Sequence, residues 1–322
     1  SGGGAGSLVP TAPGEAHYVF AAADSGRVEL FLVDTRAESL TLRATEGPAE
    51  GTAAATIQAS AAAGLMVLAG DAQSAPVRTA VPAALRVRVE DAYGNGVAGV
   101  AVDFLAQDGG RADTDPLTAG DQITALSDAA GQAECPLWEL GPTAGSQTLV
   151  VRTSFAADEV LAATALAGPA ASLRLEPEAA RSVVVASPLP VTARARDAWG
   201  NAVAGVEVTL YISDLPDGRL AGVGETDSLG VGQQRGVTGA DGGVSVLYQA
   251  PVVAGRVDVL DAAAPGLPAS TVTDLALTSV EGAAAAVEIA VPPGSVVAGQ
   301  AAALTLRLRD ALGNPAPGAT AD

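Results

Sequence analysis

The chain has 322 residues and a formal net charge of −19 at pH 7, and every one of its 17 basic residues is an arginine. A surface this acidic repels nucleic acid and anionic membranes, and no stretch approaches the ~18–20 continuous apolar residues of a membrane span. We therefore expect neither nucleic-acid binding nor membrane insertion. The absence of lysine excludes a Lys–Asn isopeptide cross-link, and a single cysteine excludes an intramolecular disulfide. With 38 glycines and 20 prolines, the composition favours many turns and short strands and argues against long helices.

The first part of the chain divides at residue 14. Residues 1–14 are rich in glycine, proline and serine and predict a flexible leader. Residues 15–60 carry four short runs that predict strands, at Tyr18–Ala22, Val28–Val33, Leu40–Ala44 and Ala53–Gln58. The only histidine, His17, stands at the start of the first of these strands.

A nine-residue motif, Asp91-Ala-Tyr-Gly-Asn-Gly-Val-Ala-Gly99, organises the rest of the chain. It returns as Asp197–Gly205 and Asp310–Gly318, and all three asparagines of the chain occupy the same position in it. A motif that repeats about every 110 residues predicts a tandem array whose unit is a small domain. We assign a structural turn to the following residues: Asp91, Gly94, Asn95, Gly99, Asp197, Gly200, Asn201, Gly205, Asp310, Gly313, Asn314 and Gly318.

Each copy of the motif follows a strand with one buried and one solvated face. Apolar and charged residues alternate there with a period of two, which is the pattern of such a strand. The predicted inward residues are Leu85, Val87, Val89, Val191, Ala193, Ala195, Leu304, Leu306 and Leu308, and the outward arginines are Arg86, Arg88, Arg194, Arg196, Arg307 and Arg309. Because the alternation resumes after the motif, the motif predicts a loop that joins two strands of a β-sandwich.

Within the motif, each residue type suits a tight turn. The aspartate carboxylate is expected to accept hydrogen bonds from backbone N–H groups two or three residues further on. The Gly-Asn pair supplies two residues that tolerate positive φ, which a chain reversal needs. The residue before the glycine is large in every copy (Tyr93, Trp199 or Leu312), and we expect it to plug the end of the sandwich.

A strand, then D-x-x-G-N-x-x-x-G, then a strand resembles the bacterial immunoglobulin-like domains of the invasin and intimin type. A second landmark of that family follows at Asp128–Gly131 and Gly239–Gly242, and an Ala-Gly return follows at Ala144-Gly145 and Ala254-Gly255. The resemblance covers roughly residues 15–322. It implies tandem immunoglobulin-like antiparallel β-sandwiches in an elongated array, and an extracellular spacer or adhesive rod.

Aligning the copies divides the chain into five parts. Residues 1–14 are the leader, 15–60 match the C-terminal half of an immunoglobulin-like domain, 61–168 and 169–282 are complete domains, and 283–322 begin a further domain. The junctions are short and rich in alanine, glycine and proline, which favours a semi-rigid rod. The two partial domains leave open apolar faces. Either the sequence is a window of a longer repeat protein, or one subunit completes the next head to tail.

No residue pattern predicts catalysis, so we expect that the chain is not an enzyme. His17 has no cysteine or carboxylate at ligand spacing, and the sequence has no nucleophile-elbow, P-loop or dinucleotide-binding motif. Asp113 with Asp115, and Asp214 with Asp217, offer oxygen ligands for calcium in expected loops, although neither pair has EF-hand spacing. Solvated carboxylates are the simpler interpretation, and we expect no metal and no cofactor.

Two further features have a structural and a functional interpretation. Cys135 shares the inward phase of its strand with Ala133 and Leu137, which predicts a buried, unreactive thiol, and the alternative is an intermolecular disulfide. The outward arginines predict cross-strand ion pairs on a solvated face, and the alternative is a stripe that binds an acidic or glycan partner. Phe104, Trp138, Trp199, Tyr211 and Tyr248 are expected to supply much of the large-residue packing.

Three functions fit these observations. The first is a structural spacer outside the cell, at the surface or in a filament. The second is an adhesin that binds a host or glycan ligand through loops, and the segments Gln107–Ala125 and Ser213–Gly236 differ between copies as binding loops do. The third is an accessory region of an enzyme. The expected partners are other copies of the chain or a cell-surface or glycan ligand, and the expected location is extracellular.

Overall fold

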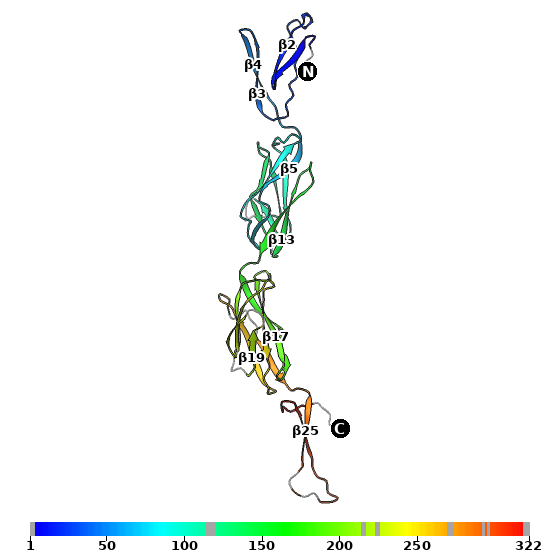
Figure 1. Ribbon diagram of the computed structural model, residues 1–322, viewed down its shortest axis with the longest axis vertical. Helices are drawn as coiled ribbons and strands as arrows, with labels where there is room; N and C mark the ends of the chain where they lie inside the picture. The colour runs from blue at the N-terminus through cyan, green and yellow to red at the C-terminus, as the bar shows by residue number, and fades with distance from the viewer. Residues whose placement is uncertain are drawn as a thin grey trace.

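The computed structural model describes residues 4–113, 120–213, 217–222, 226–268, 274–291, 294 and 297–317, without the side chains of residues 226 and 227. The chain forms a long, narrow molecule in which two β-sandwiches lie in a row between two smaller sets of strands (Figure 1). Within these residues the regular structure is strand throughout, apart from the 3-10 helix Ala22–Asp24. The all-β class and the elongated tandem sandwiches predicted from the sequence are confirmed.

Sandwich 1 is built from the strands β5 to β14. These are β5 (Ala62–Ala69), β6 (Gln73–Pro76), β7 (Leu85–Asp91), β8 (Ala101–Ala106), β9 (Arg111–Asp113), β10 (Gln122–Leu126), β11 (Gln132–Cys135), β12 (Leu137–Glu139), β13 (Gly145–Arg152) and β14 (Glu159–Leu166). One sheet has the order β10-β8-β13-β14-β6 and the other β11-β7-β5, with β12 and β9 as an additional pair. The described pairs are antiparallel except β14 with β6.

Sandwich 2 repeats this plan with the strands β15 to β24. These are β15 (Ala170–Glu176), β16 (Arg181–Val184), β17 (Pro188–Asp197), β18 (Glu207–Ile212), β19 (Arg219–Gly222), β20 (Thr226–Gly230), β21 (Gln233–Val237), β22 (Gly243–Gln249), β23 (Val257–Ala263) and β24 (Leu275–Val280). The sheets have the orders β15-β17-β22-β19 and β16-β24-β23-β18-β21-β20. The predicted boundaries 61–168 and 169–282 enclose the two sets of strands and remain predictions.

The period-two pattern of β7 and β17 accounts for the two cores. Leu85, Val87 and Val89 are each 0% exposed, and so are Val191, Ala193 and Ala195 at the equivalent positions of sandwich 2. The largest fully buried side chains are Trp138, Tyr248 and Phe104, three of the five aromatic residues expected to supply the packing. Of the other two, Tyr211 is only partly buried and Trp199 is exposed. Each sandwich has its own hydrophobic cluster of buried residues, so each buries its apolar face within itself.

The N-terminal segment consists of two hairpins, and it differs from the prediction in three places. Its strands are β1 (Ser7–Ala12), β2 (Glu15–Val19), β3 (Ser39–Glu46) and β4 (Ala49–Thr56), paired β1-β2 and β3-β4. The expected flexible leader 1–14 is therefore wrong for β1, which pairs with β2. The strand expected at Tyr18–Ala22 lies earlier, in β2, and places His17 in its middle.

The predicted strand Val28–Val33 is also wrong, because only Leu30 makes a β-bridge there. In the complete sandwiches the equivalent strands β11 and β22 pair with β7 and β17. The described residues of the N-terminal segment include no strand equivalent to β7. The run therefore stays exposed, with Phe31 at 65% and Val33 at 87%.

The C-terminal hairpin consists of β25 (Ala284–Ala290) and β26 (Thr305–Asp310). It has the predicted strand pattern, but Leu304 and Leu306 are 57% and 54% exposed, which corrects their expected burial. The reason is that, among the described residues, the hairpin pairs only with itself. Head-to-tail completion of this hairpin by another subunit stays a prediction.

The two segments expected to be binding loops are partly strand. Gln107–Ala125 holds β9 and most of β10, and Ser213–Gly236 holds β19, β20 and most of β21. β10 pairs with β8, and β21 pairs with β18, so both segments extend a sheet of their sandwich. Because the two segments differ in length, the sheet of sandwich 1 ends at β10, whereas the sheet of sandwich 2 continues from β21 to β20.

Candidate functional site: the interdomain junctions

The motif aspartate holds its own turn together. In sandwich 2, Asp197 Oδ1 accepts hydrogen bonds from the N–H groups of Trp199 and Asn201, both at 2.9 Å. Its own N–H donates to Asn201 O at 3.0 Å. The other copies repeat this geometry: Asp91 with Tyr93 and Asn95, and Asp310 with Leu312 and Asn314. The expected turn role of the aspartate thus has a definite set of donors in every copy.

The motif asparagine reaches out of its own domain. Asn201 Nδ2 donates to Pro142 O and Asn201 Oδ1 accepts from the Ala144 N–H, both at 2.8 Å. Pro142 and Ala144 belong to sandwich 1, in the loop between β12 and β13. The equivalent contacts join Asn95 to Thr35 O and the Ala37 N–H, and Asn314 to Val252 O and the Ala254 N–H. We call residues 35–37, 142–144 and 252–254 the receiving loops.

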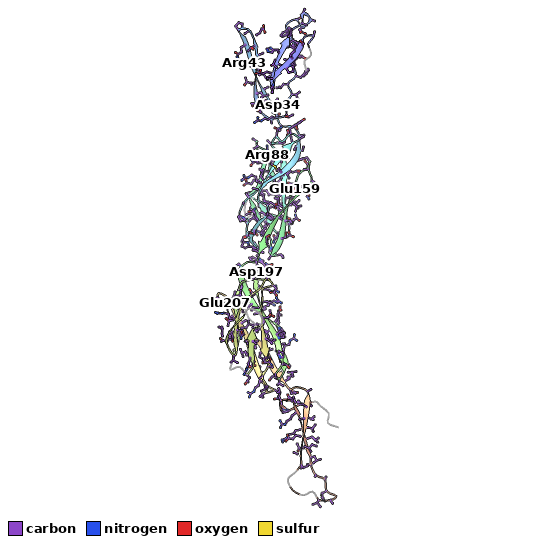
Figure 2. The ribbon with its side chains drawn as sticks, viewed as in Figure 1. Asp34, Arg43, Arg88, Glu159, Asp197 and Glu207 are labelled. Atoms are coloured by element: carbon purple, nitrogen blue, oxygen red, sulfur yellow. The ribbon has the colours of Figure 1, made fainter. Side chains whose placement is uncertain are left out.

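The second aspartate oxygen ties the asparagine to the linker between domains. Asp197 Oδ2 accepts from Asn201 Nδ2 at 2.8 Å and from the Gly168 N–H at 2.9 Å. Ser60 and Gly282 donate in the same way to Asp91 and Asp310, at 2.9 and 3.0 Å. Linker, turn and receiving loop therefore form one hydrogen-bonded network, which we call the junction clamp. Figure 2 shows Asp197 where sandwich 1 meets sandwich 2.

The clamp changes the interpretation of the asparagine. The glycines of the turn have the expected positive φ, +83° for Gly94, +88° for Gly200 and +88° for Gly313. The asparagines are not among the described residues with positive φ. A backbone requirement therefore does not explain Asn201, whereas its side-chain amide both donates and accepts between two domains.

The large residue of the motif is not the plug that the sequence suggested. Tyr93 is 64% exposed, Trp199 48% and Leu312 49%. Trp199 lies against the linker instead, since a Cβ added to Gly168 would be 3.4 Å from its ring. The inward-facing position at the end of the strand is occupied by the aspartate, which is buried in all three copies. The large residue that follows in the turn therefore faces outward.

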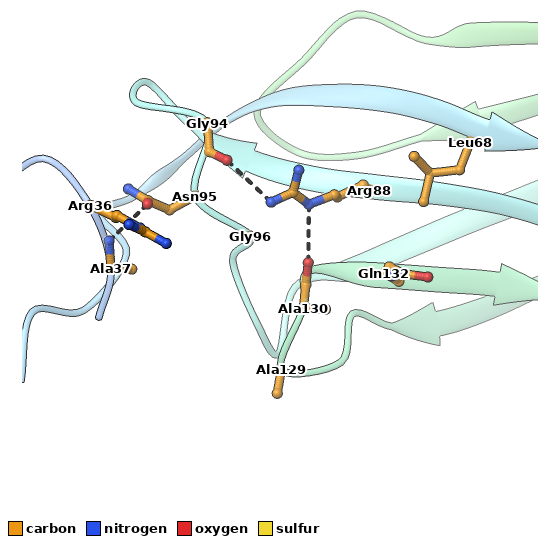
Figure 3. Close-up of a pocket in the computed structure, with 10 residues that line it drawn as sticks. All are labelled: Arg36, Ala37, Leu68, Arg88, Gly94, Asn95, Gly96, Ala129, Ala130 and Gln132. Carbon is orange, nitrogen blue, oxygen red and sulfur yellow. Dashed lines mark hydrogen bonds between the residues drawn. The ribbon is translucent and has the colours of Figure 1, made fainter. Parts of the chain in front are cut away.

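An arginine supports each turn from outside. Arg196 donates to Gly200 O at 2.7 Å, and Arg309 to Gly313 O at 2.8 Å. In the first copy Glu90 stands at this position, and Arg88 reaches the equivalent carbonyl of Gly94 at 3.2 Å. Figure 3 shows Arg88 between this carbonyl and that of Ala130, at the edge of an open pocket of about 700 Å³.

The predicted cross-strand ion pairs are present on the same face. Arg86 pairs with Glu134 of the neighbouring strand at 3.3 Å, and Arg309 pairs with Glu288 at 3.4 Å. Arg194 lies 2.8 Å from both Glu176 and Asp241. These pairs are largely solvated, so each contributes little to stability.

The buried carboxylates of the clamp stay ionised to low pH. Burial would raise the pKa of Asp310, but the hydrogen bonds from Asn314, Gly282 and Leu312 outweigh it and lower the pKa to about 2. The pKa values of Asp91 and Asp197 are lowered by the same kind of hydrogen bonds against the same burial. The aspartate is therefore ionised, and both of its carboxylate oxygens can accept hydrogen bonds from the N–H groups around it.

Acid is expected to open the clamp. A carboxylate with a lowered folded pKa stabilises the closed state above its unfolded pKa of about 4 and loses this contribution as the pH falls through the folded value. The third junction should thus open between about pH 4 and its folded pKa of about 2. The side-chain amide signals of the three asparagines, observed by NMR after selective labelling, measure this directly. Opening on a rise in pH from neutrality would contradict the assignment.

Replacing the turn glycine by valine is expected to cost about 1–3 kcal/mol, because a β-branched residue is strained at positive φ. A Cβ at Gly94 or Gly200 meets nothing within 4 Å, so the cost comes from the backbone alone. The measurement is the melting temperature of Gly94→Val and Gly200→Val. Gly64→Val is the matched control, because Gly64 also has open space but is not among the glycines with positive φ. An equal effect at Gly64 would rule out strain as the cause.

The remaining predicted sites show no convergence on a chemical centre. Cys135 is buried as predicted, its thiol donates to Leu137 O, and burial raises its pKa to about 12. His17 is exposed on β2. The described residues contain no group of three or more His, Cys, Asp or Glu that could hold a metal. Asp115, Asp214 and Gly318 lie outside the described residues.

None of the helical structure in the described residues has the length and apolar character that a membrane crossing requires.

Comparison with known proteins gives structural matches only. No family model matches the sequence, and no curated protein matches it. The chain is similar to the structure of Yersinia pseudotuberculosis InvD, with 15% identity and a TM-score of 0.44, over 78% of this chain and 72% of that one. It is similar to domains 1–6 of the surface layer protein SbsC, with 13% identity and a TM-score of 0.33, over 97% of this chain and 42% of that one.

A third match is the Yersinia pseudotuberculosis adhesin InvE, with 17% identity and a TM-score of 0.30, over 67% of this chain and 58% of that one. The chain thus spans less than two thirds of the SbsC and InvE structures. All three TM-scores are below 0.5, so the fold assignment rests on the strands and sheets of this chain and not on these matches. By its strand order and its two separate cores, the chain has the fold of tandem immunoglobulin-like β-sandwiches.

Proposed function

We propose that the chain is an extracellular structural region of a bacterial surface protein, a spacer whose sandwiches are held in line by the junction clamps. The observation that supports this most strongly is that all three junctions make the same contacts with the same residue types. The asparagine bonds of the second junction measure 2.8 Å, and those of the third measure 3.0 Å. A chain selected only for independent domains has no need to repeat such a network.

The linkers support the same proposal. Residues 167–169 separate β14 from β15, and residues 281–283 separate β24 from β25. Connections of this length restrict the orientations of two domains before any contact forms. Two additional net hydrogen bonds from the asparagine stabilise the closed junction by about 1–3 kcal/mol. The short linker and the clamp together favour one relative orientation of neighbouring sandwiches.

Small-angle scattering on the chain tests the spacer proposal. We expect an elongated particle whose length does not change with salt, because the clamp consists of short hydrogen bonds rather than exposed ion pairs. A compact particle, or a length distribution as broad as that of freely jointed domains, would contradict the proposal. The matched control is the Asn201→Ala chain, which should give the broader distribution.

An adhesin function has one specific observation in its favour. The hairpin of β20 and β21 forms the outer edge of a sheet, and it exposes Leu229 at 48%, Val231 at 62% and Val237 at 57%. Exposed edges with apolar side chains are surfaces on which partners add. Binding of surface glycans or host-cell proteins that is lost in Val231→Asp would support this function, and an unaffected or absent binding would favour the spacer.

A further inference from the structure

The residue after the clamp asparagine differs among the three junctions. It is Gly96 at the first, Ala202 at the second and Pro315 at the third. This residue matters chemically because the backbone nitrogen that follows an asparagine can attack its side-chain amide. Glycine offers the least steric resistance and the widest choice of φ, alanine offers more resistance, and proline has no N–H to attack with.

We propose that Asn95 is a site of spontaneous deamidation, restrained by the closed clamp and able to release the first junction. In the reaction the Gly96 nitrogen bonds to Asn95 Cγ, the Cγ–Nδ2 bond breaks, and the amide leaves as ammonia with the proton from Gly96. Water then opens the resulting succinimide ring and leaves aspartate or isoaspartate at position 95. The inference goes beyond the spacer function and holds whether or not the chain is a spacer.

The Gly96 N–H is not one of the two donors that form the β-bridge next to the turn. Glu90 and Gly96 form an isolated antiparallel bridge, made by the hydrogen bonds Asp91 N–H to Asn95 O and Val97 N–H to Val89 O. Neither of these two bonds uses the Gly96 N–H. The attacking group therefore lies beside the asparagine without being one of the donors that hold the bridge.

The structure also explains why glycine stands at this reactive position. A Cβ added to Gly96 would lie 2.1 Å from Ala130 O, a contact that backbone atoms cannot relieve without moving. The loop at Ala130 thus requires glycine at position 96. Packing within sandwich 1, against the loop between β10 and β11, therefore requires the Asn-Gly dipeptide that the other two copies of the motif do not have.

The closed clamp restrains the reaction by holding the amide. Asn95 Nδ2 donates to Thr35 O at 2.7 Å and to Asp91 Oδ2 at 2.9 Å, and Asn95 Oδ1 accepts from the Ala37 N–H at 2.8 Å. Figure 3 shows the Asn95 amide facing Ala37 with Gly96 next in the loop. Cγ must leave these contacts to approach the Gly96 nitrogen, so the reaction requires an open clamp.

The product cannot re-form the clamp. An acid at position 95 has a carboxylate oxygen where Nδ2 donated, facing the Asp91 carboxylate and the Thr35 carbonyl, and acceptors repel there. An isoaspartate also lengthens the backbone between the two bridge bonds. Deamidation would therefore convert a reversible opening of the first junction into a permanent one.

The test is peptide mapping by mass spectrometry after prolonged incubation of the whole chain at neutral pH. We expect Asn95 to lose its amide on the order of tenfold faster than Asn201, because glycine reaches conformations that alanine does not, and Asn314 to remain intact. The variant Ala202→Gly should give Asn201 the behaviour of Asn95. Equal rates at Asn95 and Asn201, or no gain at Asn201 in Ala202→Gly, would overturn the proposal.

The restraint by the clamp has its own pair of variants. Ala37→Pro removes the N–H that Asn95 Oδ1 accepts, and should speed loss of the Asn95 amide roughly two- to tenfold, the factor for one net hydrogen bond. Ala144→Pro makes the same change at the second junction and should leave the Asn95 rate unchanged. Scattering from Asn95→Asp should show a more variable N-terminal segment. An unchanged rate in Ala37→Pro, or native scattering from Asn95→Asp, would refute the role of the clamp.

Discussion

Replacing Asp197 by alanine is expected to destabilise sandwich 2 by on the order of 3 kcal/mol, because it leaves four buried or partly buried donors without their acceptor. The carboxylate accepts hydrogen bonds from Trp199, Asn201 and Gly168, and Asp197 is 4% exposed. Its removal opens the turn and detaches the linker in one step. We therefore expect this substitution to have the largest effect on folding of any in the motif.

Urea unfolding followed by tryptophan fluorescence measures this effect in each sandwich. The chain has two tryptophans, Trp138 in sandwich 1 and Trp199 at the turn of sandwich 2. The transition reported by Trp199 should move to lower urea, and that of Trp138 should stay within about 0.5 kcal/mol of its native value. Asp241→Ala is the matched control, since its solvated ion pair with Arg194 is worth at most about 1 kcal/mol. A native Trp199 transition in Asp197→Ala would contradict the network.

Replacing Asn201 by alanine is expected to loosen the second junction while both sandwiches remain folded. The substitution removes the two bonds to the receiving loop and one to Asp197, of which the first two join different domains. At about 0.5–1.5 kcal/mol for each net hydrogen bond, the closed orientation loses about 1–3 kcal/mol. The population of molecules with an open second junction then rises roughly five- to 150-fold. The folding equilibria of the two sandwiches are expected to change much less.

Asn201→Asp separates the amide from the shape of the side chain. It keeps an oxygen for the Ala144 N–H, but it cannot donate to Pro142 O and it places a second carboxylate beside Asp197. Like charges at hydrogen-bond distance disfavour the closed state. We therefore expect Asn201→Asp to open the junction at least as far as Asn201→Ala at neutral pH. A closed junction in Asn201→Asp would show that shape, and not the amide donor, is what matters.

The strands around the motif could be predicted because their burial has a period of two. Leu85, Val87 and Val89 are separated by charged residues, and a pattern of this kind has one physical solution in a sandwich. The same rule failed at Val28–Val33, where the alternation is present but the pairing strand is not among the described residues. Strand formation depends on a partner as well as on a pattern, and the partner is not visible in the local sequence.

The role of the asparagine was missed for a different reason. The atoms that Asn201 contacts are the Pro142 carbonyl and the Ala144 N–H, and backbone groups carry no signature in a sequence. One signal was available in the motif, because all three asparagines occupy the same position in it. In addition, the Ala-Gly pairs at 144–145 and 254–255 precede Asn201 and Asn314 at nearly the same spacing. A turn that needs only positive φ would use glycine or aspartate as readily. The strict use of an amide pointed to a group that both donates and accepts.

The exposure of Trp199 was not predicted because the aspartate had not been recognised as the buried residue of the turn. The sequence suggested a plug because a large residue recurs, and burial is the usual place for one. Once the aspartate is recognised as the buried member of the turn, its neighbours along the Asx-turn face solvent and the linker. The large residue then covers the junction from outside rather than filling the sandwich.

The central claim is that the clamp fixes the orientation of neighbouring sandwiches, and a spin-label distance across the second junction tests it most directly. Leu126 and Val237 are 67% and 57% exposed at equivalent positions of the two sandwiches, and Leu126→Cys with Val237→Cys supplies the label sites. The native Cys135 does not compete, because it is buried.

We predict a single narrow distance distribution in the labelled chain and a broad one after Asn201→Ala. Asn314→Ala, the same change at the third junction, should leave the distribution narrow. Equal widths with and without Asn201 would contradict the claim that this clamp holds the sandwiches in line.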